Sequence, residues 1–260
     1  MSKNNLKELA EKYGTDKLEH GYIDSYSRYF GSLKEDAVNL LEIGVRYGDS
    51  VWMWHDYFRN GTIYGMDILN NAGYYKKFHK TYFNEKKNKH IALWPHEETG
   101  DMLKFDHLPN SQKAILLEET KNKILDALPK ERFSLTIGDQ SNLDDLANVV
   151  SECKSGFDII IDDGLHAAAH QQISLGFLFK HRNPGGIYVI EDLHMGTERD
   201  EDPWVDSTNK VLKAFKATGK FSNQCTDEYS YLEENIAEVE WTLANEKICF
   251  IKKAVDSAGA

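Results

Sequence analysis

The sequence predicts an α/β fold with a Rossmann-like, mostly parallel sheet of seven strands that ends in an antiparallel hairpin. Two observations support this fold class. Short apolar runs alternate with helical stretches along most of the chain, as expected where helices cover a parallel sheet. The last two strand-like runs are separated by only three residues, which is the spacing of a hairpin.

Five apolar runs are expected to form the parallel strands, because each is short and is bounded by Gly, Asp or Pro. These runs are 37–43, 62–68, 133–137, 157–161 and 186–190. The hairpin that follows is expected over 236–243 and 247–252.

Two segments lie outside the predicted sheet. Residues 1–36 are expected to form an N-terminal helical cap, and residues 71–131 a long insertion with helical periodicity over 111–128. Insertions of this length are typical of a lid, a substrate wall or an oligomer contact. We therefore expect one domain over 1–260, assembled as a homo-oligomer.

Composition excludes several classes of protein. A formal net charge of −11 argues against a nucleic-acid or anionic-membrane surface. No apolar run is long enough to span a membrane, and the first residues lack the apolar core of a signal peptide. The three cysteines (Cys153, Cys225 and Cys249) have no C-x-x-C spacing. These features predict reduced thiols and a cytoplasmic protein without membrane insertion.

Acidic residues follow all five predicted parallel strands. In an open α/β sheet, ligands bind beyond the carboxyl ends of the strands. An aspartate also caps helices, but that explanation suits one strand end better than all five. The pattern indicates a ligand rich in hydroxyls, amines or cations. The residues are Glu42, Asp67, Asp139, Asp162, Asp163, Glu191 and Asp192.

The turn after the first strand favours S-adenosylmethionine as a cofactor. Gly44 and Gly48 form a G-x-x-x-G spacing that leads into Ser50, and Arg46 occupies the middle glycine position of the dinucleotide fingerprint. Glu42 before this turn would repel a pyrophosphate, whereas it suits the positively charged amino group of S-adenosylmethionine. An NAD-dependent oxidoreductase is the alternative.

Other strand ends add expected cofactor contacts. Asp67 lies 25 residues after Glu42, where its carboxylate can accept both ribose hydroxyls. Asp139 and Gln140 lie where an adenine is expected, although a turn with an aspartate cap explains them more simply. Asp162, at the end of the fourth strand, is also expected at the cofactor.

The segments D-D-G-L-H over 162–166 and E-D-L over 191–193 predict a metal site. They end two strands that are neighbours in such sheets, and carboxylates that close together repel each other unless a cation joins them. Hard oxygen ligands suit Mg²⁺ or Mn²⁺. The H-x-x-x-H pair of His166 and His170 leaves zinc as an alternative.

His166 is the candidate general base. Methyl transfer to a hydroxyl needs an in-line approach and loss of the hydroxyl proton, which a metal and a nearby histidine both assist. His166 is three residues after Asp163, at the start of the next predicted helix. A capping or packing role is the alternative for His166, and it is the preferred interpretation of His170 and His194.

These motifs carry a resemblance to a known family. They are K-Y-G-T-D-K over 12–17, L-E-I-G-V over 41–45, G-D-Q over 138–140, D-D-G-L-H over 162–166 and P-G-G-I-Y-V-I-E-D-L over 184–193. The chain resembles the metal-dependent sugar O-methyltransferases of antibiotic biosynthesis, such as the mycinamicin-type macrolide glycoside enzymes and the calicheamicin-type rhamnose enzymes.

The resemblance implies a class I methyltransferase fold and specific roles. Asp163, Glu191 and Asp192 would hold Mg²⁺, and His166 would be the base. The segment around Thr15 would fold over the methyl donor, with His20 and Tyr22 nearby.

The acceptor implied by the resemblance is a sugar hydroxyl of a nucleotide sugar, a glycoside or a capsular polysaccharide precursor. Leu165 stands where family members usually have serine, and residues 71–131 do not align with the family. A phenolic or other small secondary metabolite is therefore the alternative acceptor. A non-catalytic binding protein is a further alternative, which the complete acidic set disfavours.

Overall fold

The structure is a computed structural model of the chain. It describes residues 6–69, 81–84, 89–92, 94–95, 98–99, 102–103, 108–195, 205–221 and 228–255. The chain divides into two compact units, which are treated separately below. The first comprises Met1–Val45, Asp49–Asp67 and Pro129–Ala260, and the second comprises Arg46–Gly48 and Ile68–Leu128.

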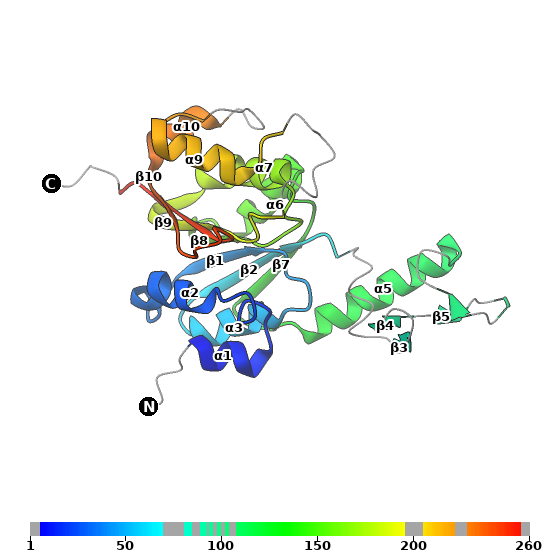
Figure 1. The fold of residues 1–260 in the computed structure, drawn as a ribbon. Coiled ribbons are helices and arrows are strands. Elements are labelled where there is room, and N and C mark those ends of the chain that lie inside the picture. Colours follow the sequence, from blue (N-terminus) through cyan, green and yellow to red (C-terminus); the bar gives the residue numbers. More distant parts are fainter. Residues whose placement is uncertain are drawn as a thin grey trace. The chain divides into compact units, whose positions relative to one another are not determined.

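The first unit contains a seven-stranded sheet with the order β10-β11-β9-β8-β1-β2-β7 (Figure 1). Neighbouring strands are parallel from β7 to β9, while β11 runs antiparallel to both β9 and β10. This arrangement confirms the predicted mostly parallel sheet with a terminal antiparallel hairpin. The strands are β1 (Asn39–Ile43), β2 (Thr62–Asp67), β7 (Phe133–Ile137), β8 (Phe157–Asp162), β9 (Arg182–Ile190), β10 (Ile236–Trp241) and β11 (Cys249–Lys253).

Strand β9 begins at Arg182, four residues before the predicted start at 186. The pairing of β9 with β8 passes from Arg182 opposite Phe157 to Ile187 opposite Ile159, so the intervening residues form an irregularity. Pro184 lies in that irregularity, where its missing N–H costs no ladder hydrogen bond. This bulge explains why a proline is compatible with a strand that has neighbours on both sides.

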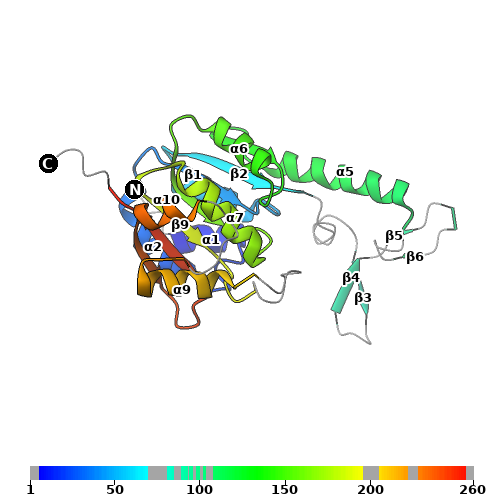
Figure 2. The same cartoon turned by 90° about the horizontal axis from the view of Figure 1, so that it is seen from above.

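Helices cover both faces of the sheet (Figures 1 and 2). On one face lie α1 (Leu6–Tyr13), α2 (Ile23–Phe30), the short 3₁₀ helix η1 (Gly31–Leu33) and α3 (Asp49–Tyr57). On the other lie α6 (Leu143–Glu152), α7 (Ala168–Phe179), α9 (Thr208–Thr218) and α10 (Tyr229–Asn235). None of the helices in the described ranges is long and apolar enough to cross a membrane.

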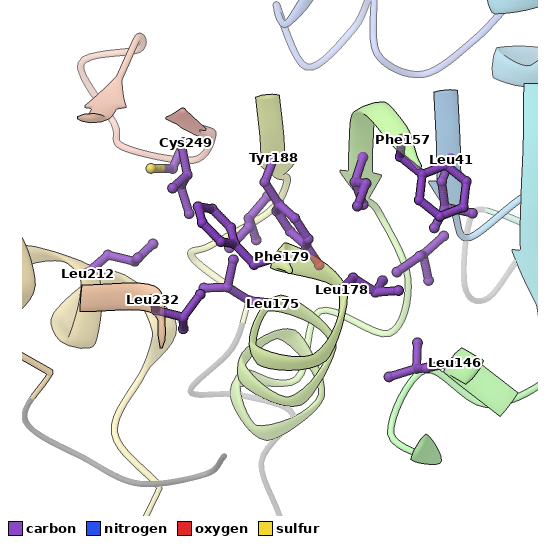
Figure 3. Packing of buried hydrophobic residues seen from close by; sticks show 14 of the residues in the cluster. Leu41, Leu146, Phe157, Leu175, Leu178, Phe179, Tyr188, Leu212, Leu232 and Cys249 are labelled. Carbon is purple, nitrogen blue, oxygen red and sulfur yellow. The ribbon is translucent and has the colours of Figure 1, made fainter. Parts of the chain in front are cut away.

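Each face of the sheet has its own core. Figure 3 shows the core beneath α6, α7, α9 and α10, where strand residues Leu41, Phe157, Tyr188 and Cys249 meet helix residues Leu146, Leu175, Leu178, Phe179, Leu212 and Leu232. The opposite face has an aromatic cluster of fully buried rings: Tyr26, Phe30, Trp54, Phe58 and Phe250. Burial of each such side chain contributes about 1.5–3 kcal/mol, so these cores hold the strand ends in place.

The second unit contains a long helix and two short strand pairs. Helix α5 (Asn110–Ala127) confirms the helix predicted over 111–128. Strand β3 (Thr81–Asn84) pairs with β4 (Lys89–Ala92), and β5 (Trp94–Pro95) pairs with β6 (Met102–Leu103). Much of the remainder of the predicted insertion lies outside the described residues.

Candidate functional site

The sheet brings three strand ends together at one edge. In the sheet register, Ile43 of β1 lies opposite Asp162 of β8, which lies opposite Ile190 of β9. The residues that follow these three therefore emerge side by side. Among them are Asp163 and Glu191, both predicted from the sequence as metal ligands.

Asp163, His166 and Asp192 form a compact group that can hold a metal ion. One ligand atom from each lies within 4.8 Å of the others. Nε2 of His166 is 3.9 Å from Oδ1 of Asp163 and 3.7 Å from Oδ2 of Asp192. The three side chains are only 12–19% exposed, so they are partly shielded from water but not sealed. Two carboxylates beside an imidazole are a suitable donor set for a divalent cation.

The backbone at this group adopts an unusual conformation. His166 has a φ of 65° and Asp192 a φ of 51°, in the left-handed region that few residues other than glycine adopt. In addition, Nδ1 of His166 is buried and makes no hydrogen bond with any residue that the structure describes. Strained backbone and unpaired buried polar atoms concentrate at functional sites, and both occur here on residues of one group.

The ammonium of Lys17 provides a positive charge among the carboxylates at this edge. Its side chain is fully buried, and Nζ lies 2.7 Å from both Asp163 Oδ2 and Glu191 Oε1 and 3.2 Å from Glu42 Oε1. Burial lowers the pKa of Lys17, but the three carboxylates outweigh burial and raise it well above its ordinary value. The ammonium therefore stays charged.

Two tyrosines of the N-terminal region bind the same carboxylates. The hydroxyl of Tyr22 donates to Oδ1 of Asp192 at 2.5 Å, and that of Tyr26 donates to Oε1 of Glu191. Burial opposes ionisation of Asp192, yet the Tyr22 bond and the neighbouring histidines lower its pKa below the ordinary value. Asp192 is thus kept as an anion.

The edge carries more negative charge than Lys17 neutralises. Among the described residues, three carboxylates (Glu42, Asp163 and Glu191) pair with one ammonium, and the carboxylate of Asp192 is bound by the neutral hydroxyl of Tyr22. Burial and the adjacent Asp163 raise the pKa of Glu191 well above its usual range, although Lys17 and Tyr26 oppose the increase. A divalent cation would remove this excess, so the residues present fit the predicted metal.

Glu191 was predicted as the third metal ligand, but the compact group contains His166 in its place. Oε1 of Glu191 binds Lys17 and Tyr26. The three-carboxylate ligand set therefore stays a prediction.

Glu42 and Ser50, predicted at the cofactor, bind each other. Oγ of Ser50 donates to Oε2 of Glu42 at 2.8 Å, and Nε1 of Trp54 donates to Oε1 at 3.2 Å. Glu42 is fully buried and also pairs with Lys17. A direct contact of Glu42 with a cofactor stays a prediction, since its oxygens serve protein donors in this structure.

Gly44 and Thr15 hold the same edge from two sides. Gly44 has a φ of 92°, and a Cβ placed on it would lie 2.0 Å from the carbonyl oxygen of Asp163. The glycine therefore lets the turn after β1 contact the loop after β8. Thr15 is buried, and its hydroxyl accepts a hydrogen bond from the backbone N–H of Lys17 at 3.4 Å.

Asp162 and Gln140 brace the loop that carries the candidate metal ligands. Asp162 is fully buried and accepts from Gln140 Nε2 at 3.0 Å and from Ser174 Oγ at 2.5 Å. Oε1 of Gln140 in turn accepts from the backbone N–H of Leu165 at 2.7 Å. A Cβ on Gly164 would lie 1.9 Å from that same oxygen, which explains the glycine. Both polar residues thus fix the position of the loop.

Asp67 and Asp139 lie at or just after the ends of β2 and β7, which are neighbours in the sheet. Asp67 ends β2 opposite Ile137 of β7, and its carbonyl accepts from the N–H of Gly138. Oδ1 of Asp139 accepts two bonds of 2.8 Å from the N–H and hydroxyl of Ser141. Burial opposes ionisation of Asp139, but these bonds lower its pKa.

Gly48 belongs to the second unit, where its φ is 81°. A Cβ on Gly48 would lie 2.5 Å from the side chain of Leu128, so this glycine also has a packing role within that unit.

Sequence reasoning missed the roles of Lys17, Tyr26 and Ser174. Lys17 belongs to a recognised motif, but nothing local distinguishes it from an exposed lysine such as Lys12. A serine in the middle of α7 likewise gives no sign that it binds Asp162. Only the fold brings these residues together.

The sheet order and the two strand-end loops define the class as a Rossmann-like methyltransferase fold, which confirms the predicted fold class. No protein-family model matches the chain. The predicted resemblance to sugar O-methyltransferases is confirmed by the similar proteins found. The 8-demethyl-8-alpha-L-rhamnosyl tetracenomycin-C 2'-O-methyltransferase of Streptomyces olivaceus is 29% identical over 193 residues, 71% of this chain. The demethylmacrocin O-methyltransferase of Streptomyces fradiae is 27% identical and covers 99% of this chain.

A solved structure extends the similarity to the fold. The MycE methyltransferase from the mycinamycin biosynthetic pathway, in complex with Mg and SAH, superposes with a TM-score of 0.63 at 25% identity and covers 99% of this chain. The chain spans 36% of the S. olivaceus protein, 55% of the S. fradiae protein and 57% of the MycE chain.

Proposed function

We propose that this chain is an S-adenosylmethionine- and Mg²⁺-dependent O-methyltransferase that acts on a sugar hydroxyl. The observation that carries the proposal is the group of Asp163, His166 and Asp192 at the ends of β8 and β9. It occurs in a methyltransferase fold whose relatives are named sugar O-methyltransferases, and the similar MycE structure contains Mg and SAH.

Asp163 and Asp192, together with Glu191, would hold the metal. When bound, Mg²⁺ or Mn²⁺ would supply Lewis-acid chemistry that makes the acceptor hydroxyl more acidic. Tyr22 orients the carboxylate of Asp192, while Lys17 and Tyr26 orient that of Glu191. These partners keep the carboxylates in one arrangement, so the site needs little reorganisation.

Residues at the other strand ends would hold the methyl donor. The carboxylate of Asp67 would receive ribose hydroxyls, and Asp139 with Gln140 would border the adenine. Gly44 lets the turn after β1 lie close to a ligand, and the segment around Thr15 would cover the donor. Glu42, Ser50 and Asp162 are buried and would hold these residues in position. Gly48 would let the backbone of its own turn pass close to the donor.

His166 would accept the proton of the acceptor. Its Nε2 faces Asp163 and Asp192, which would bring the ring close to a hydroxyl held at the metal. A positioned base of this kind contributes about 10²–10⁴-fold to a rate. Coordination of the metal by His166 is the competing role, since the same nitrogen belongs to the compact group.

The base and ligand roles are separable by substitution. We expect His166→Ala and Asp163→Asn each to lower turnover at least about 100-fold while the fold survives, because each removes an aid to proton loss. Titration with Mn²⁺ separates the roles: Asp163→Asn weakens binding, whereas His166→Ala leaves it near that of the wild type. EDTA abolishes turnover.

His181→Ala serves as the matched control, because His181 packs against Phe177 at the opposite end of α7. Its turnover and Mn²⁺ affinity are expected to stay unchanged. Full activity of the Asp163 and His166 variants, or activity in EDTA, would contradict the proposed mechanism. Loss of Mn²⁺ binding in His166→Ala would instead make His166 a ligand.

The acceptor class needs its own test, because a sugar diol and a catechol both offer two adjacent oxygens to a metal. Incubation with S-adenosylmethionine, Mg²⁺ and a matched panel of rhamnosides and catechols, read by mass spectrometry, decides between them. Methylation of a rhamnoside supports the proposal. Methylation of catechols alone favours the second candidate, a phenolic O-methyltransferase.

The surroundings of the enzyme are also part of the proposal. We infer a cytoplasmic homo-oligomer that binds small-molecule glycosides and no nucleic acid. The net charge of −11 supports the absence of nucleic acid, and the free, buried thiols of Cys153 and Cys249 support the cytoplasmic location. Cys225 lies outside the described residues.

A further inference from the structure

Lys17 occupies a central position at the site edge without reaching the solvent. The side chain is 0% exposed, and its ammonium contacts carboxylates that lie near or directly after the carboxyl ends of three adjacent strands. Those strands are β1, β8 and β9, which are neighbours in the sheet. A buried ammonium is costly unless it is fully paired, so the fold retains it in a defined arrangement.

The backbone around Lys17 is fixed by short-range hydrogen bonds. The N–H of Thr15 donates to the carbonyl of Ala10 at 3.3 Å, and the N–H of Tyr22 donates to the carbonyl of Lys17 at 3.0 Å. These bonds tie the connection between α1 and α2 to the end of α1. The side chain of Lys17 therefore reaches the site from a turn whose backbone is held by hydrogen bonds.

Lys17 and His166 lie nearest to different oxygens of Asp163. Nζ binds Oδ2 of Asp163, whereas Oδ1 is the oxygen nearest His166. The carboxylate is thus held by the lysine through one oxygen and presents the other to the group. On Glu191, Nζ shares Oε1 with Tyr26.

We propose that Lys17 is a positioning residue for the metal site, which sets the orientation of Asp163 and Glu191 through its buried ammonium. It touches neither substrate nor cofactor in this role and acts only through the two carboxylates. This inference rests on the proposed function, because it assumes that these carboxylates bind a divalent cation. Partners that orient metal ligands in this way typically change metal affinity about 10–100-fold when they are removed.

A competing effect has the opposite sign. An ammonium beside a metal repels it, so removal of the charge alone would tighten metal binding. Positioning predicts weaker binding. The direction of the change in affinity therefore separates the two roles.

The test measures the dissociation constant of Mn²⁺, from the electron paramagnetic resonance signal of free Mn²⁺, on the full chain. Lys17→Met is expected to raise the dissociation constant at least about 10-fold. Lys12→Met is the control, since Lys12 is half-exposed on α1 and pairs with Asp56 away from the site. The control is expected to match the wild type in affinity.

Removal of Lys17 leaves Glu42 buried without its cation, and this change alone can prevent folding. The second comparison is therefore Lys17→Met with Glu42→Gln against Glu42→Gln alone. The carbonyl oxygen of the glutamine can still accept from Nε1 of Trp54, and its amide NH₂ can donate to Oγ of Ser50. The comparison therefore isolates the contacts of Lys17 with Asp163 and Glu191. The double variant is expected to bind Mn²⁺ at least about 10-fold more weakly than the single variant.

An unchanged or lower dissociation constant in either folded comparison would overturn the role of Lys17. If wild-type protein binds no Mn²⁺, the metal of the proposed function is wrong. If the wild type binds Mn²⁺ and the lysine variants bind it equally well, only the inference on Lys17 fails. The melting temperature, measured beside each titration, identifies variants that are not folded.

Discussion

Gly44 is the point where the turn after β1 meets the loop after β8. Its φ is 92°, and a Cβ on it would lie 2.0 Å from the carbonyl oxygen of Asp163. Both the backbone conformation and the contact therefore require glycine. Since Asp163 is a candidate metal ligand, a substitution at Gly44 is expected to affect both the stability of the fold and the position of that ligand.

Gly44→Ala is expected to lower the free energy of unfolding by about 2–4 kcal/mol, because left-handed strain and a backbone clash each cost about 1–3 kcal/mol. Urea denaturation measures the change. Gly219→Ala is the control for strain alone: Gly219 has a φ of 71° and has nothing within 4 Å of the added Cβ. Equal losses in both variants would show that the contact with Asp163 carries no energy.

The candidate site was predictable wherever a residue's role follows from its place at a strand end. Asp163 and Asp192 were found in this way, because adjacent parallel strands bring their carboxyl ends to one edge. Lys17 was not, since its contacts with Asp163 and Glu191 span 146 and 174 residues of sequence. The periodicity and spacing of residues near Lys17 in the sequence do not predict a contact with residues so far along the chain.

At the scale of elements, α1 is attached to α3 through a polar contact. Asp56 on α3 accepts from Lys12 Nζ at 2.8 Å and from the hydroxyl of Tyr13 at 2.5 Å. Burial opposes ionisation of Asp56, but these two bonds lower its pKa below the ordinary value. This contact anchors the helix that precedes Lys17.

The lowered pKa of Asp56 gives stability a defined pH dependence. In the window between the folded pKa and the ordinary value near 3.8, the unfolded chain binds more protons. The stabilisation is thus complete above that window and is lost as the pH falls through the folded pKa. Asp56→Asn is expected to cost less than about 1 kcal/mol at pH 7, as for exposed ion pairs.

Melting temperatures at pH 7 and pH 3 measure this effect, and the difference between the wild type and Asp56→Asn should shrink at the lower pH. Glu11→Gln, an exposed change on the same helix, is the control. If the difference in melting temperature is equally large at pH 3, the stabilisation comes from packing and not from the charge of Asp56.

The elements were predicted to different degrees. Buried parallel strands such as β1 and β8 are short apolar runs with clear limits, and their predicted positions agree closely with the structure. Strand β9 starts earlier than predicted because a bulge accommodates Pro184, and no local rule signals a bulge. The position of the bulge depends on how β9 pairs with β8.

At the scale of the whole molecule, every group of the candidate metal site comes from the first unit. Lys17, Glu42, Asp163, His166 and the pair at 191–192 all lie within it. The mostly parallel sheet was predictable from the alternation of strands and helices. Residues 71–131 were predicted as an insertion, but the sequence does not show whether they pack as a separate compact unit.

Replacement of Ile68–Leu128 by a Gly/Ser linker is therefore expected to preserve cooperative unfolding and Mn²⁺ binding. The linker needs about a dozen residues or more, because β2 and β7 are parallel and require a crossover. Calorimetry and Mn²⁺ titration measure the outcome, and loss of cooperative unfolding would place the region in the folding core.

The left-handed backbone at His166 and Asp192 has an evolutionary consequence. Glycine and asparagine adopt this conformation at lower cost than histidine, so selection for stability alone would favour them there. A gene copy released from selection for catalysis, but still selected for stability, would gain from those residues at these two positions. The residues at these two positions thus distinguish working copies from decayed ones among related genes.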